Sequence, residues 1–381
     1  MLICTEHLEQ LQNWTLDQRI KTRLEDTGFP RLSELGKCQH DNQLLEYVVS
    51  HFNPNTCGFE FGDTKLVFSL KDVLKITGLH ITGKPVTGID DDMIFWSNKY
   101  FGQDLNFKKQ GSSLFKSSSK GDADTLYLPL LYNVGEIKDY AWGAAALAHL
   151  YCSMKNIKEK GIKHLHGIAL SLQVFIFLRL KNIKDLRKLP SLNVANEQLP
   201  LIGDWSRHLE QFTLNKSKKV DYLDLINKIT AKEVNYNPYD DIQFPDKEEY
   251  STFELEKRVC CKSTLQQTYL INFNEVAFFQ PHKFKKQYSN ACVGDKHYKH
   301  KWKLYPRGGR KGKDWQERKN YRKYINHWNI SCLAKRPQLE RGQDFVMSDC
   351  IEDAGDNNED GEETKIKETL GKWKQHVPIL V

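Results

Sequence analysis

Apolar residues in the first 80 positions recur with two periods, which separate expected helices from an expected hairpin. Helical spacing extends over residues 8–24, and again over 42–53 behind Asp41, a good N-cap residue. Alternation around Gly62-Asp63 predicts a β-hairpin near residues 58–68. Ser69 then begins a short helix that ends at Gly78.

Two apolar segments in the middle of the chain predict the centre of the core. Residues 140–151 are rich in Ala and Gly, which favours a helix that another helix can approach closely. Residues 168–180 are apolar on every side, so we expect a buried helix here and expect it to be the neighbour of the first. Residues 102–124, rich in Gly, Ser, Lys and Asp, predict a surface loop.

The remaining pattern completes a mainly α (α+β) fold with one small β-hairpin. Residues 181–250 are polar with short helical pieces such as 220–229, and residues 264–288 return to structure. A last helix is expected over 314–328, with an apolar stripe of Tyr321, Tyr324, Ile325 and Trp328. The longest apolar stretch is far shorter than the roughly 20 residues of a membrane span, so we expect a soluble chain with no membrane partner.

Charge divides the chain into three parts. Residues 281–336 carry 17 basic and 3 acidic side chains, residues 337–381 carry 5 and 11, and the rest is nearly balanced. The acidic end holds few large apolar residues, which predicts a largely disordered tail. We therefore expect one folded domain over 8–335, whose end is the basic segment 281–336, and a tail over 337–381.

The cysteines indicate a reducing compartment. Nine are present, no C-x-x-C occurs, and the first residues lack the basic-then-apolar pattern of a signal peptide. An intracellular location is the expectation.

The sequence lacks the motifs of several enzyme classes, which favours a protein that is not an enzyme. The Gly-Asp pairs lack the His and Asn companions of a metallophosphatase, and no glycine-rich cofactor cup or P-loop occurs. Asp90-Asp91-Asp92 is more typical of a solvated loop than of a two-metal site. The spacing of Cys260, Cys261, Cys292, His297 and His300 fits neither a zinc knuckle nor a zinc finger. We expect no cofactor, no metal and no small-molecule substrate.

The basic segment is the best functional candidate, because it interleaves cations with aromatic rings. Cations can neutralise phosphates while aromatic faces stack on bases. A nuclear-import signal and a solvated basic face with Trp302 and Tyr305 packed into the body remain alternatives. The candidate residues are Lys299, Lys301, Trp302, Lys303, Tyr305, Arg307, Arg310, Lys311 and Lys313.

Several strings, in this order, resemble one known family. They are Leu24–Phe29, Ser69–Leu79, Gly83–Gly88, Asp139–Tyr151, Gly167–Phe175, Pro281–Tyr288 and Asp314-Trp315 with Tyr324, Ile325 and Trp328. Together they resemble the plant mobile domain, also called the aminotransferase-like plant mobile domain, over roughly residues 10–330. This domain occurs in maintenance-of-meristems-like proteins and in the long form of a plant serine/threonine phosphatase 7.

The resemblance implies a mainly helical domain found in plant transposons and in host genes derived from them. It further implies a nuclear protein linked to meristem maintenance, genome stability and transposon silencing, with no established catalytic residues. The chain departs from the family pattern in the lysine-rich stretch 181–262 and at Ile271–Val276.

The resulting prediction is a non-enzymatic nuclear interaction protein with unknown nuclear protein partners and DNA or RNA as a candidate ligand. The alternative is a transposon-encoded accessory protein, or an inactive remnant of one, with a nucleic-acid-binding or degenerate nuclease role. Cytoplasm is the alternative location.

Overall fold

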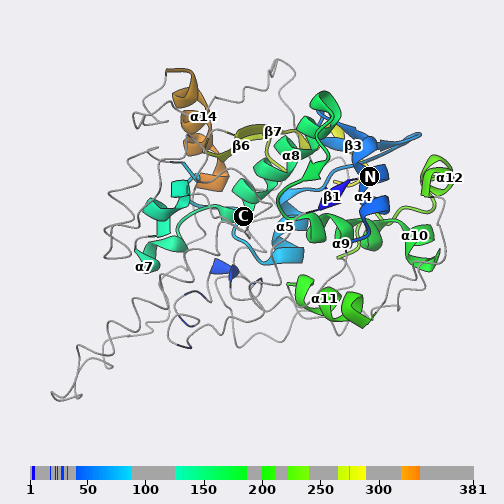
Figure 1. Ribbon diagram of the computed structural model, residues 1–381. Helices are drawn as coiled ribbons and strands as arrows, with labels where there is room; N and C mark the ends of the chain where they lie inside the picture. Colours follow the sequence, from blue (N-terminus) through cyan, green and yellow to red (C-terminus); the bar gives the residue numbers. More distant parts are fainter. Residues whose placement is uncertain are drawn as a thin grey trace, which may run out of the picture.

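A computed structural model describes residues 2–4, 40–87, 125–131, 133–186, 200–211, 222–239, 265–273, 275–288 and 319–334, with isolated positions between 18 and 32. Helices make up about half of this part, and the strands form small sheets (Figure 1). The mainly α (α+β) class is thus confirmed at this level. The surface loop over 102–124, the tail over 337–381 and most of the helix expected over 8–24 lie outside the described residues.

The first described helix and sheet follow the expected pattern closely. Helix α4 (Asn42–Ser50) begins at Asp41, whose Oδ1 accepts a 3.0 Å hydrogen bond from the Leu44 N–H. The helix ends earlier than expected, because Phe52–Asn53 forms strand β2 ahead of Pro54. Strands β3 (Gly58–Phe61) and β4 (Thr64–Leu66) form the expected hairpin, and β2 adds a third antiparallel strand.

Helix α5 (Leu70–Thr77) has both of the predicted ends. The Ser69 side chain accepts from the Asp72 N–H while the Asp72 carboxylate accepts from the Ser69 N–H, which is a capping box. Gly78 ends the helix at φ 76°, a left-handed conformation that favours glycine.

Helix α8 (Trp142–Lys160) lies at the centre of the molecule, and α9 (Ala169–Arg179) is buried on nearly all sides (Figure 1). The main neighbours of α8 are α5, β6 (Thr268–Asn272) and β7 (Glu275–Phe279), whereas α9 packs on α5 and α10 (Lys181–Leu186). The predicted close pairing of α8 with α9 is therefore wrong. The small Gly143 instead admits the backbone that follows α5, since a Cβ there would lie 2.8 Å from the Leu79 carbonyl oxygen.

The expectation of a single hairpin is also wrong, because β6 and β7 form a second one. All five residues of β6 are buried, with α8 packed on the hairpin and α14 (Lys319–Ile330) packed on β6. A strand covered in this way shows no alternation in its sequence. The departure from the family pattern at Ile271–Val276 is the tip of this hairpin.

Short elements connect these parts. Strand β1 (Ile3–Cys4) pairs in parallel with β5 (His164–Leu165). The others are η3 (Thr125–Leu131), α7 (Val134–Ile137), α11 (Ile202–Gln211), α12 (Tyr222–Asn227), η5 (Pro281–Lys283) and η6 (Cys332–Ala334). The helical piece expected over 220–229 is thus present as α12.

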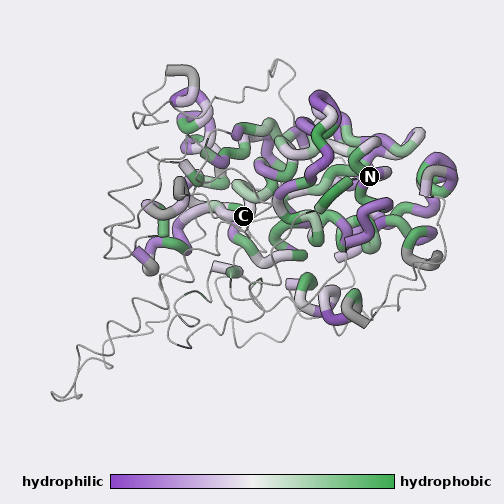
Figure 2. The backbone as a smooth tube through the Cα atoms, in the orientation of Figure 1, coloured by the Kyte–Doolittle hydropathy of each residue, from purple (hydrophilic) through white to green (hydrophobic). Residues whose placement is uncertain are grey.

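The buried apolar side chains form one hydrophobic cluster. Figure 2 colours the hydrophobic segments of the backbone green. Trp142, Trp205 and Trp328 are at most 1% exposed, so residues from distant parts of the chain meet in one core. Tyr321 and Trp328 of the expected α14 stripe are buried, and Tyr324 and Ile325 pack against the cluster. In the part of the chain described, no helix combines the length and apolar character needed to cross a membrane.

Candidate functional site

The nine candidate residues between Lys299 and Lys313 lie outside the described residues. The same is true of Asp90–Asp92 and of Cys260, Cys261, Cys292, His297 and His300. These predictions therefore remain predictions. The described residues include the two ends of the basic segment and two polar clusters in the folded part of the chain.

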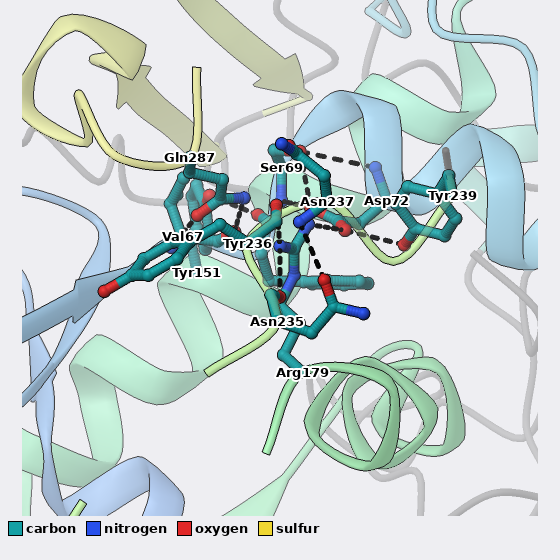
Figure 3. A network of polar contacts seen from close by, with 11 residues as sticks. Val67, Ser69, Asp72, Tyr151, Arg179, Asn235, Tyr236, Asn237, Tyr239 and Gln287 are labelled. Atoms are coloured by element: carbon teal, nitrogen blue, oxygen red, sulfur yellow. Dashed lines mark hydrogen bonds and ion pairs between the residues drawn. The ribbon is translucent and has the colours of Figure 1, made fainter. Parts of the chain in front are cut away.

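Both ends of the basic segment are anchored to the core. At one end, the Gln287 side chain accepts from the Val67 N–H at 3.0 Å and donates to the Val67 carbonyl at 2.8 Å (Figure 3). At the other, Tyr321 Oη donates to the Phe273 carbonyl at 2.6 Å, and Trp328 Nε1 donates to the Gly83 carbonyl at 2.9 Å. The described chain therefore enters and leaves this segment from fixed positions.

Basic side chains reach solvent at both anchored ends. Lys283, Lys285 and Lys286 are exposed after β7, and Arg322 and Lys323 are exposed on α14. Among the described residues, none of these four lysines has a carboxylate partner. The basic segment thus places part of its positive charge on the ordered surface near both of its ends.

The strongest polar cluster is a buried ion pair between α5 and α9 (Figure 3). Arg179 Nη2 lies 2.6 Å from Asp72 Oδ1, and their side chains are 2% and 0% exposed. Asp72 Oδ1 also accepts from Tyr239 Oη at 2.7 Å, and its Oδ2 accepts from Ser69 Oγ at 2.5 Å. The buried carboxylate is therefore surrounded by donors.

The arginine ties a third segment into this network. Arg179 Nη1 donates to the Tyr236 carbonyl at 2.7 Å, and the Asn235 N–H donates to the Arg179 carbonyl at 2.8 Å. Burial alone would lower the pKa of Arg179, but the adjacent Asp72 carboxylate raises it overall. Burial, followed by the charge of Asp72, raises the pKa of Tyr239 well above its usual value. The network is enclosed and holds α5, α9 and residues 235–239 together.

Sequence reasoning identified Ser69 as a helix cap but missed the ion pair. One signal was present, since Arg179 is the single charged residue in the mostly apolar α9. A charge at the end of a buried helix needs a partner. Its identity could not be read from the pattern, because Asp72 lies 107 positions away.

A second cluster brings three histidines and a glutamate together. His149 Nδ1 lies 2.6 Å from Glu275 Oε2, which also accepts from Asn272 Nδ2 at 3.0 Å. The His166 ring lies 6.4 Å from that of His149 and 6.1 Å from that of His164. Burial, followed by the two neighbouring histidines, lowers the pKa of His166 to about 4. Among the described residues, no group of three His, Cys, Asp or Glu side chains is placed to hold a metal ion.

Comparison with known proteins defines the class to which this chain belongs. The family model described as the plant mobile domain matches residues 107–344, well over half of the sequence. The chain therefore belongs to the plant mobile domain family, as the resemblance of its motifs predicted. A second model, described only as a domain of unknown function, matches residues 11–113.

The curated relatives come from Arabidopsis thaliana. Protein MAIN-LIKE 2 is 24% identical over 75% of this chain and 47% of its own length. Protein MAINTENANCE OF MERISTEMS is 22% identical over 63% of this chain and 57% of its own. A serine/threonine-protein phosphatase 7 long form homolog is 23% identical over 47% of this chain and 16% of its own. The chain thus spans about half the length of the first two relatives, and no solved structure matches it.

Proposed function

We propose that this chain is a non-enzymatic nuclear interaction protein of the plant mobile domain family, and that its basic segment contacts nucleic acid. Meristem maintenance is the process that the name of one relative suggests. The partners would be nuclear proteins together with DNA or RNA. The same basic cluster would serve nuclear entry.

The observation that carries this proposal is the position of the charge. Residues 281–336 hold 17 basic and 3 acidic side chains, and both ends of the segment are hydrogen-bonded to the core. A segment whose two ends are already fixed loses less conformational entropy on binding than a free tail does, which favours binding of nucleic acid by this segment. Three of these basic side chains, Lys285, Lys286 and Lys323, are exposed on the described surface near these ends.

The polar clusters of the folded body support the proposal that the chain is not an enzyme. The charged pair Asp72–Arg179 is at most 2% exposed, so its groups hold elements together rather than face a substrate. The His149–Glu275 pair, whose side chains are 29% and 18% exposed, joins α8 to the β6–β7 hairpin.

The test replaces Lys301, Lys303, Arg310 and Lys311 by Ala together in the full chain. We expect weaker binding to duplex DNA in a fluorescence-anisotropy titration, with a nearly unchanged melting temperature. The matched control removes four exposed lysines from the described surface: Lys138, Lys160, Lys163 and Lys232. Equal losses in the two variants would contradict a local site. Unchanged binding with lost nuclear entry would show the segment to be an import signal alone.

Trp302 separates base stacking from packing. If its ring stacks on a base, Trp302→Ala should weaken single-strand binding by about 1–3 kcal/mol and leave thermal stability unchanged. A lower melting temperature with unchanged binding would place the ring in the body instead.

A further inference from the structure

Helix α14 has two faces of different character. One face carries the stripe Tyr321, Tyr324, Ile325 and Trp328, which packs on the core. The other face is exposed and carries Arg322, Lys323, Asn326, Asn329 and Ile330. At 100° per residue, positions 322, 326 and 329 form one row along the helix, with 323 and 330 to one side. Figure 1 shows the helix at an edge of the molecule.

The exposed row has an unusual composition for a solvated helix. The whole helix, KNYRKYINHWNI, contains no Asp or Glu, whereas exposed helical surfaces usually carry both charges. No described residue forms a hydrogen bond with the side chains of Lys323, Asn326 or Asn329. Ile330 is 82% exposed, the largest value among the exposed large apolar residues of the described part.

From this face we propose that α14 reads base edges in the major groove of duplex DNA. The inference rests on the proposed function, in which the part of the basic segment that precedes α14 holds the phosphates. Asn pairs with the N6 and N7 edge of adenine, and an apolar side chain contacts the thymine methyl group. Asn326 and Asn329 supply the first kind of contact, and Ile330 supplies the second.

The contacts that fix α14 to the core suit this role. A reading helix must be held rigidly, because a loose one cannot distinguish base pairs. The Tyr321 hydroxyl is bonded to the Phe273 carbonyl and lies 2.9 Å from Thr87 Oγ1. Tyr324 and His327 lie with ring centroids 4.7 and 5.0 Å from that of Tyr269. Twelve residues give a length of about 18 Å, long enough to lie across the groove.

The experiment selects sequences from a pool of random duplex DNA with the full chain. We expect an enriched motif bound more tightly than its scrambled version. Asn326→Ala and Asn329→Ala should each reduce that preference by about 5- to 150-fold, the range for losing one bidentate base contact. Lys323→Ala should weaken binding equally for both sequences. The control is Asn227→Ala, which removes an exposed asparagine from α12, away from α14 in Figure 1, and should change nothing.

The outcomes distinguish failure of the reading role of α14 from failure of the proposed function. Salt-sensitive binding with no enriched motif would overturn the reading role of α14 and leave the proposed function standing. A motif that survives both asparagine variants would also overturn it. Absence of binding to either DNA or RNA would contradict both. A preference for duplex RNA or for a protein ligand at this face would contradict the assignment to the major groove of DNA.

Discussion

At the scale of single residues, the pair Asp72–Arg179 is the most informative contact. An ion pair that is 0% and 2% exposed has lost its hydration, so it is stable only while both partners and their donors are present. Removing one partner leaves a buried charge without compensation. This is why the loss of a partner costs much more than the pair itself contributes.

We predict that Arg179→Met destabilises the chain by about 3–5 kcal/mol in a urea titration, since Asp72 is then buried alone. The double variant Asp72→Asn with Arg179→Met should lose less than the single one. The control is Lys228→Ala, which breaks the exposed pair with Asp224 and should cost at most about 1 kcal/mol. Equal losses for the buried and the exposed pair would contradict the role given to the network.

His166 gives the second prediction at this scale, a pH dependence. Its pKa is lowered from 6.5 to about 4 by burial and by the neighbouring His149 and His164, with Glu275 opposing the shift. Between these values the unfolded chain takes up a proton that the folded chain does not, so stability falls as the pH drops from 6.5 toward 4. Urea midpoints at pH 7.5 and pH 5 should differ more for the wild type than for His166→Gln. The same pH response in both would show that His166 does not titrate in this way.

At the scale of elements, the approach of α8 to the chain after α5 depends on Gly143. A Cβ there would lie 2.8 Å from the Leu79 carbonyl and 3.0 Å from that of His80, whereas one at Gly203 in α11 would meet nothing within 4 Å. Gly143→Ala should therefore lose about 1–3 kcal/mol despite the better helix propensity of alanine. Gly203→Ala should be neutral or gain up to about 1 kcal/mol. Melting curves of the two variants make the comparison, and a stabilised Gly143→Ala would refute the close contact.

Elements fixed by local chemistry were predictable from the sequence. The caps at Asp41, Ser69 and Gly78 and the two-residue turn at Gly62-Asp63 depend on neighbouring residues only, and all appear in the structure. The β6–β7 hairpin was not predicted, because burial of every residue of β6 removes the alternation that reveals a strand. The partner of α8 was also missed, since Gly and Ala residues show that something comes close but not what it is.

For the candidate site, too, some features could be predicted from the sequence and others required the structure. Clustering of Lys and Arg is visible in the sequence, so the basic segment could be identified without a fold. The Asp72–Arg179 pair and the His149–Glu275 pair join residues 107 and 126 positions apart, and no local pattern relates them. The exposed face of α14 required the structure, because only the packing of its stripe shows which side remains open.

At the scale of the whole molecule, two family matches share one core. Residues 11–113 match one family model and residues 107–344 match another, yet their buried side chains form a single cluster. The Asp72–Arg179 pair crosses from the first match to the second. The two matched segments are thus parts of one folded body, which carries the basic segment between anchored ends.

The central claim is that this body presents its positive charge to nucleic acid, and the salt dependence of binding tests it most directly. The affinity of the full chain for a duplex would be measured by anisotropy over a range of salt concentrations. With about five phosphate contacts, a plot of log affinity against log salt should have a slope of roughly −4 to −5, which becomes flatter in the quadruple variant of Lys301, Lys303, Arg310 and Lys311. A slope near zero, or no binding at the lowest salt, would contradict the account.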